Sequence, residues 1–290
     1  MGVNESVVLL KPSLNQWASR VIMIKCIALA TLLVVCWPLP PEGHADDHPK
    51  VVRNFDYRKT VDDIGGDLRR ALGAAQRRVI ATAPVRFNDE KVPAVWLTEV
   101  NEDGGQVGAV VVSAGFIDLC RNVSHAKAID VVRSGYFDRY IHLLSEESGA
   151  SGLKPLPDID DPGYWTPAVM NDQQTNLRQM VGLVVGTKLA HHYLGQYKKY
   201  SARILDAQGR RTPINQFLSA GEFEDALLAG TRLALDTGLG LEGCKALYDA
   251  IGHMDKRPAW TASFLPESVK VKALKKRMEK VERKFFGGDE

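Results

Sequence analysis

The sequence predicts a mainly helical α+β protein with one small antiparallel sheet and a buried helix at its centre. Several segments repeat apolar residues at three- and four-residue steps, which is the period of an amphipathic helix. Two short runs rich in β-branched residues flank the turn sequence Asn-Glu-Asp-Gly-Gly, which indicates a hairpin. Residues 180–189 are apolar on nearly all sides, so their helix is expected inside the domain. The sequence shows no alternation of strands and helices, so a parallel sheet is not expected.

Composition places the chain among ordinary globular proteins. It has 290 residues, of which 45% are hydrophobic and 25% charged, so one domain over residues 46–290 is the simplest interpretation. The net charge of +2 and the lack of a basic stripe with interleaved aromatics predict no nucleic-acid partner.

The first 45 residues are interpreted as an export signal. Lys25 precedes an apolar run over residues 27–37, and the prolines after it end the run. Cleavage is expected after Ala45, and Met23 is the alternative start. The run is too short to span a bilayer, so the mature chain is predicted to lack a transmembrane span and to be periplasmic in a bacterium. An uncleaved anchor or a buried strand is the alternative.

The cysteines leave two alternatives open. Of the four, Cys26 and Cys36 would depart with the signal, and Cys120 and Cys244 would remain. In an oxidising compartment the remaining two could pair, and two buried free thiols are an equal alternative. The absence of a Cys-x-x-Cys motif excludes a thiolate zinc site.

The expected elements follow one another in a simple order. Helices alternate with one hairpin and one long loop rich in Gly, Pro and Asp. The predicted helices cover residues 57–82, 125–147, 171–200, 221–236, 241–253 and 267–286, the strands cover 92–100 and 106–113, and the loop covers 148–168. The long helix is expected to begin near Asn171, which forms a capping box with Gln174.

The C-terminal helix, residues 266–286, is amphipathic and strongly basic. Its apolar residues recur at three- and four-residue steps. It could lie on an anionic membrane surface. We expect instead that it packs on its own domain with its charges solvated.

The buried helix contains two adjacent histidines, His191 and His192. The main functional question is whether they belong to a zinc site. In a zinc peptidase the metal site is formed by the motif His-Glu-x-x-His. This motif puts two imidazoles on one helix face and a Glu beside the bound water. Here Thr187 and Lys188 stand at the first ligand and the general base, and His191 stands at the second ligand. His192 and Gln196 have the same spacing, with Gln at the second position.

The chain resembles the zinc metallopeptidases of the CAAX prenyl endopeptidase type, which include bacterial heat-shock proteases. The resemblance covers residues 55–240. It is carried by Val-Val-Val-Ser-Ala-Gly-Phe-Ile-Asp-Leu at 110–119, by the His-bearing stretch 186–197, and by Glu-Phe-Glu-Asp-Ala at 222–226. It implies a zincin-like single domain, a third ligand at Glu222, and a substrate strand formed by Val110, Val111, Val112 and Ser113.

The departures from the family pattern predict a degenerate site. Thr is a poor zinc ligand, and a Lys at the general-base position repels a divalent metal. We therefore expect no resident cofactor, a protein without proteolytic activity, and a role in binding a peptide or in the envelope structure. A peptide would add to the 110–113 strand. The alternative is an active zinc peptidase with ligands from His191, His192, Glu222 and Glu224.

Each site residue also has a structural interpretation. His191 could be a hydrogen-bonded core histidine. Glu222 could complete a capping box with Ser219. A buried Lys188 needs an acidic partner, because an unpaired buried charge is costly. We therefore predict an ion pair between Lys188 and Glu222, or Glu224, in the space that zinc would take.

Overall fold

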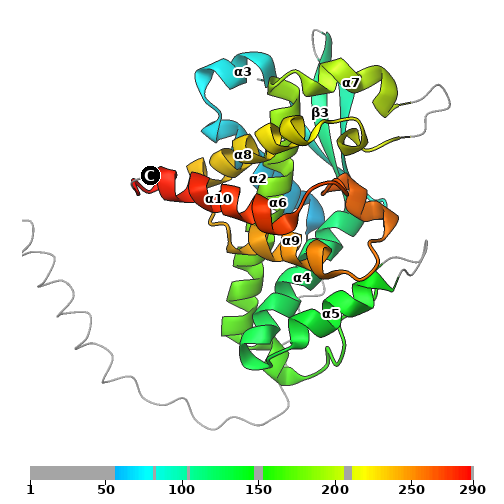
Figure 1. Ribbon diagram of the computed structural model, residues 1–290, viewed down its shortest axis with the longest axis vertical. Coiled ribbons are helices and arrows are strands. Elements are labelled where there is room, and N and C mark those ends of the chain that lie inside the picture. Colours follow the sequence, from blue (N-terminus) through cyan, green and yellow to red (C-terminus); the bar gives the residue numbers. More distant parts are fainter. Residues whose placement is uncertain (1–55, 81–82, 103–104, 147–152, 206–210, 289–290) are drawn as a thin grey trace, which may run out of the picture. The chain divides into compact units, whose positions relative to one another are not determined.

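The computed structural model describes residues 56–80, 83–102, 105–146, 153–205 and 211–288 (Figure 1). The predicted export signal and its cleavage site, together with residues 46–55, lie outside the described residues. The described residues belong to one folded unit within Val51–Glu290.

Helices dominate this unit, as the sequence predicts. The helices are α2 (Tyr57–Ala71), α3 (Ala74–Ile80), α4 (Ala114–Val132), α5 (Tyr136–Ser145), α6 (Pro167–Tyr193), α7 (Gln196–Ile204), α8 (Ala220–Asp236), α9 (Glu242–His253) and α10 (Val271–Phe285). The apolar stripe expected on the first helix is buried, with Val61, Ile64 and Leu68 inside the core. The α+β class and the helical majority are therefore confirmed.

The sheet is mixed, which corrects the prediction of a purely antiparallel one. Strands β2 (Val95–Glu102) and β3 (Gly105–Ser113) form the predicted antiparallel hairpin. A third strand, β1 (Val85–Asn88), pairs in parallel with the far edge of β3, so the order is β1-β3-β2. Four residues are too few to show a clear alternation, so β1 has no recognisable strand pattern in the sequence.

Three helix breaks were not predicted. The first amphipathic helix divides at Gly73 into α2 and α3, and α4 begins eleven residues before the expected position 125. Gly135, at φ +83°, separates α4 from α5, and Gly195, at φ +74°, separates α6 from α7. A left-handed residue stops the helical ladder, and glycine adopts that conformation without steric cost.

The buried central helix is α6. It starts earlier than expected because Thr166 caps it and Pro167 occupies its first position, where proline is favoured. Every residue from Gln179 to His192 is buried. Figure 1 shows α6 running through the middle of the unit, with the sheet beside its C-terminal half and α4 beside its N-terminal half.

Helix α8 approaches α6 very closely at two small residues. A Cβ added to Gly230 would lie 2.6 Å from the Thr187 backbone nitrogen, and one added to Gly186 would lie 3.3 Å from the Gly230 carbonyl oxygen. The small residues Gly186 and Gly230 thus allow the two helices to come this close. This crossing fixes the backbone around Thr187 and Lys188.

Helix α10 packs on its own domain, as expected. Leu274 and Met278 are buried, and the helix contacts α8 and α9. Most of its basic residues are exposed on the remaining side.

Candidate functional site

Lys188 is buried in the middle of α6 and has no acidic partner among the residues that the structure describes. Its Nζ donates a hydrogen bond to the backbone oxygen of Ser263 at 3.1 Å. The amide nitrogen of Asn215 donates to the same oxygen at 3.0 Å. Burial lowers the pKa of Lys188 to about 7. The predicted ion pair of Lys188 with a glutamate is therefore wrong, because the carbonyl of Ser263, at the end of the 3-10 helix Ala259–Ser263, takes the carboxylate's place.

His191 is a core histidine with one engaged nitrogen. Its Nδ1 lies 2.5 Å from the side-chain oxygen of Gln196, which can only accept, so Nδ1 carries the proton. Its Nε2 is buried and has no hydrogen-bond partner among the described residues. Burial, and then the nearby charge of Lys188, lower the pKa of His191 to about 3. The imidazole is neutral at physiological pH.

Gln196 links His191 to the start of α8, and sequence reasoning did not foresee this role. Its amide nitrogen donates to the backbone oxygen of Glu222 at 2.8 Å, while its oxygen accepts from His191. The amide is nearly fully buried. The sequence offers one signal for this role: Gln196 stands four residues after His192, where the second histidine of a zinc motif would stand.

His192 joins the central helix to the sheet. Its Nε2 donates to the backbone oxygen of Ala109 in β3 at 3.1 Å. Its ring packs against Gly108, where an added Cβ would lie 2.5 Å from ring atoms. Burial lowers the pKa of His192 as well. The contacts describe a structural histidine that holds α6 against β3.

Glu222 completes the capping box of α8. Its carboxylate accepts from the Ser219 backbone nitrogen at 2.9 Å, and Ser219 Oγ accepts from the Glu222 nitrogen at 3.2 Å. Lys199 donates to the same carboxylate at 2.7 Å, and Tyr200 donates at 3.1 Å. These hydrogen bonds, led by that of Lys199, lower the pKa of Glu222 to about 2.

Glu224 pairs with Arg277 of α10. Because Glu222 faces α7 and Glu224 faces α10, neither carboxylate is directed at Lys188. The four proposed ligands therefore do not converge on one point, and the described residues contain no group of three His, Cys, Asp or Glu that could hold a metal ion. The buried lone pair of His191 Nε2 is the one feature that suits a metal, and the Lys188 amine beside it does not. A zinc ion does not fit this donor set.

The strand formed by Val110, Val111, Val112 and Ser113 cannot accept an added peptide strand. Its residues pair with β1 on one edge and with β2 on the other, so β3 is the central strand. Ser113 is buried and caps α4 by accepting from the Phe116 nitrogen at 3.0 Å. Strand addition at this position, which the sequence suggested, is therefore contradicted, because addition needs a free edge.

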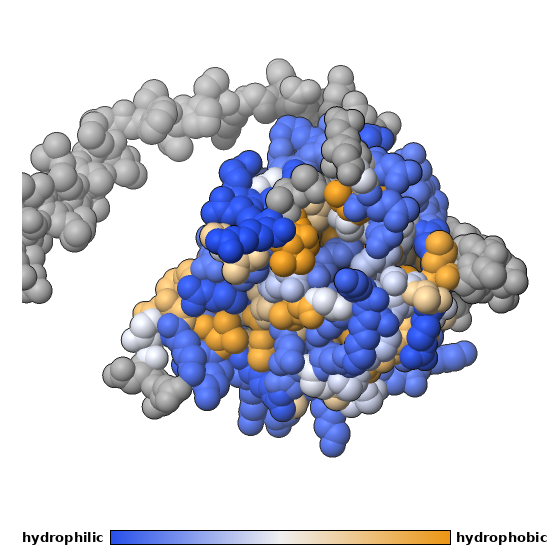
Figure 2. Space-filling view, turned by 90° about the horizontal axis from the view of Figure 1, so that it is seen from above, coloured by the Kyte–Doolittle hydropathy of each residue, from blue (hydrophilic) through white to orange (hydrophobic). Residues whose placement is uncertain are grey.

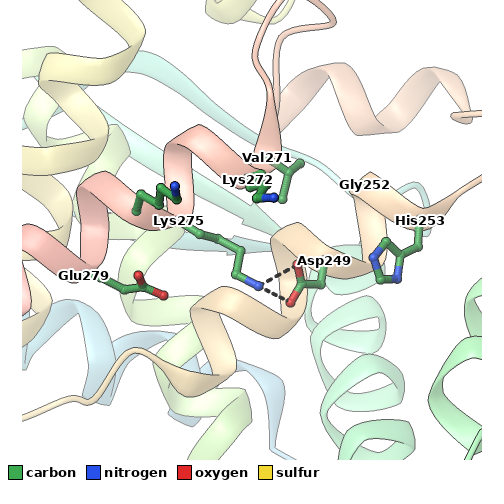
Figure 3. Close-up of a pocket in the computed structure, with 8 residues that line it drawn as sticks. Asp249, Gly252, His253, Val271, Lys272, Lys275 and Glu279 are labelled. Carbon is green, nitrogen blue, oxygen red and sulfur yellow. Dashed lines mark hydrogen bonds and ion pairs between the residues drawn. The ribbon is translucent and has the colours of Figure 1, made fainter.

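The hollows on the described surface lie elsewhere. One of about 310 Å³ is lined by residues of α4, α6 and the loop between α5 and α6, including His125 and Trp165. Another, of about 480 Å³, lies between α9 and α10 (Figure 3). Neither is lined by Lys188 or His191. The face in Figure 2 is mostly hydrophilic, with hydrophobic residues in small separate groups.

No family model, curated protein or solved structure matches this chain in the three comparisons. Within the described residues, no helix is long and apolar enough to cross a membrane.

Proposed function

We propose that this chain is an exported, non-catalytic relative of the CAAX-type zinc metallopeptidases, which binds a peptide or protein, or supports the envelope, and cleaves nothing. The observation that carries the proposal is the hydrogen bond from Lys188 to the Ser263 carbonyl. It fills the general-base position with an amine that is held by the protein's own backbone.

The Lys188 amine could act as a base only in its neutral form and only within reach of a substrate. With a pKa of about 7, a fraction of the amine is neutral near pH 7, and a neutral amine can act as a base. A general base must also reach the proton that it removes. Lys188 is buried, and neither hollow described above touches it. A substrate bound in either of these two hollows would therefore not reach its nitrogen.

A second candidate, an active zinc peptidase with unusual ligands, rests on one observation. His191 Nε2 is a buried acceptor with no partner among the described residues, and a metal would complete it. This candidate would require Glu222 to leave Lys199, Tyr200 and the capping box.

A cleavage assay separates the two candidates. The full chain is incubated with casein, with added Zn²⁺ and with a chelator, beside the variants His191→Ala and His142→Ala. His142 is an exposed histidine of α5 and serves as the matched control. We expect no cleavage above the blank in any sample. Cleavage that needs Zn²⁺ and disappears in His191→Ala, but persists in His142→Ala, would establish the peptidase.

Peptide binding is tested by a separate measurement. Thermal unfolding of the full chain is followed with a library of extended peptides. A peptide that raises the midpoint and is recovered intact supports a binding protein. If no peptide shifts the midpoint, peptide binding is excluded and the envelope role remains.

A further inference from the structure

The solvated side of α10 carries a row of cations. Lys272, Lys276, Lys280 and Arg283 are all exposed and recur at steps of four, four and three residues. Residues at these steps lie on one side of a helix. The buried residues Leu274 and Met278 face the opposite side. With a rise of about 1.5 Å per residue, the row is roughly 16 Å long.

The cations of this row do not form ion pairs with other described residues of the domain. Two other basic residues of α10 are paired, the half-buried Lys275 with Asp249 at 2.6 Å and the exposed Arg277 with Glu224. The four residues of the row form no ion pair within the described part of the chain. Glu279, which is half-buried, is the acidic residue at the edge of the row. The row, four cations with one carboxylate beside them, therefore presents a net positive charge to solvent.

The hollow between α9 and α10 adds to this surface. Lys272 and Lys276 belong to its lining, together with His253 at the end of α9. Figure 3 shows Lys275 turned toward Asp249, so that this carboxylate of the hollow is neutralised from within, while Glu279 is the second acidic residue of the lining. A phosphate group at its mouth would meet free lysines first.

An exposed aromatic residue follows the row directly. Phe286 is 74% exposed, and its ring meets the edge of Phe285 at a centroid distance of 5.1 Å. Phe285 itself is partly buried and lies under the Arg232 guanidinium. Lysines and arginines beside an exposed aromatic ring are the combination that binds membrane interfaces, where the cations meet anionic headgroups and the ring enters the acyl boundary.

We propose that this surface, formed by Lys272, Lys276, Lys280, Arg283 and Phe286, docks the protein on an anionic phospholipid bilayer. Charge complementarity selects anionic headgroups. The flat row on a rigid helix and the adjoining phenylalanine favour a membrane over an acidic protein. The inference is independent of the role of the central helix, since none of these residues contacts Lys188 or His191.

The test measures binding of the full chain to vesicles by co-sedimentation. Vesicles of phosphatidylcholine alone are compared with an equal mixture of phosphatidylcholine and phosphatidylglycerol, at low and high salt. The test variant is Lys272→Gln/Lys276→Gln/Lys280→Gln. The control, Lys91→Gln/Lys127→Gln/Lys198→Gln, removes the same charge from exposed lysines of other elements. Every sample carries the same N-terminal apolar run, so differences between variants belong to α10.

We expect wild type and control to bind the anionic vesicles more tightly than the neutral ones, and high salt to weaken this preference. The α10 variant should bind anionic vesicles at least about tenfold more weakly, since each basic residue contributes about a factor of five near such a surface. Phe286→Ala should weaken binding and leave the salt dependence unchanged. Equal binding of the α10 variant and the control, or no preference of wild type for anionic vesicles, would overturn the proposal. Wild type that ignores vesicles but binds an acidic protein would do so too.

Discussion

The Nζ of Lys188 lies 3.1 Å from the backbone oxygen of Ser263, and this hydrogen bond crosses 75 positions of sequence. It joins the central helix to the segment that precedes α10. Asn215 donates to the same oxygen, so one carbonyl serves two buried donors. An ammonium group with neutral acceptors alone is poorly compensated for the loss of water. Burial of the charged Lys188 therefore lowers the free energy of unfolding by a measurable amount.

Replacing Lys188 with methionine should stabilise the protein near pH 6. The folded pKa of about 7 lies below the ordinary value of 10.5, so the folded state resists protonation and the buried charge destabilises it by up to about 5 kcal/mol. We expect Lys188→Met to raise the free energy of unfolding by about 2 kcal/mol or more at pH 6. Chemical denaturation measures this.

The pH dependence of that difference identifies the cause. Between pH 7 and 10.5 the unfolded chain binds the proton and the folded chain does not, so the stability of wild type rises with pH. The advantage of Lys188→Met should therefore shrink over this range. Lys198→Met, at an exposed position of α7, should show no such trend. A constant advantage from pH 6 to pH 10 would mean that Lys188 is not a buried charge.

Removing His191 should destabilise the protein at neutral pH. The change to alanine leaves a cavity and deprives the buried Gln196 oxygen of its donor, so we expect a loss of about 2–3 kcal/mol. His142→Ala should change stability by less than about 0.5 kcal/mol. Equal effects of the two substitutions in denaturation experiments would contradict the buried hydrogen bond.

His191 should also shape the acid side of the stability curve. Its folded pKa of about 3 lies below the ordinary 6.5, so its contribution is complete above pH 6.5 and is lost as the pH falls toward 3. Wild type should lose more stability than His191→Ala across this window. Parallel curves for the two proteins would show that His191 is protonated in the folded state.

The close crossing of α6 and α8 predicts a strong glycine effect. Gly230→Ala places a Cβ 2.6 Å from the Thr187 nitrogen, and the helices must separate, at a cost of about 2 kcal/mol or more. Gly221→Ala, in the first turn of the same helix, meets nothing within 4 Å and should be neutral or slightly stabilising. Thermal unfolding of both variants measures this. Similar midpoints would argue against the crossing.

Cys120 and Cys244 should behave as protected thiols. Both are free and fully buried, and burial raises the pKa of each well above its ordinary value. In a chain carrying Cys26→Ser and Cys36→Ser, a thiol reagent should label neither in the folded state and both after unfolding. Rapid labelling of the folded protein would contradict their burial, and unlabelled unfolded protein would reveal a disulfide.

The sequence predicted what depends on local patterns. The hairpin followed from its turn residues, the burial of α6 from its uninterrupted apolar run, and the capping box of α8 from Ser219 and Glu222. Helix breaks at Gly135 and Gly195 were missed because a single glycine inside a helical pattern does not show whether it adopts a positive φ.

The partners of the site residues could not be predicted, because they come from positions far apart in the chain. Ser263 and Asn215 carry no pattern that links them to Lys188, and the carbonyl of any residue could have taken that place. Strand β1 likewise became visible only through its pairing with β3, which closed the edge that a peptide would need.

Metal content tests the central claim most directly. The full chain is purified without chelator, dialysed against Zn²⁺ and then against metal-free buffer, and analysed for zinc per chain by mass spectrometry. Because Gln196 engages Nδ1 of His191 and the Lys188 charge acts on the same ring, we predict far less than one zinc per chain, and the same value in His191→Ala. One zinc per chain in wild type that is lost in His191→Ala would show that the central helix carries a metal site.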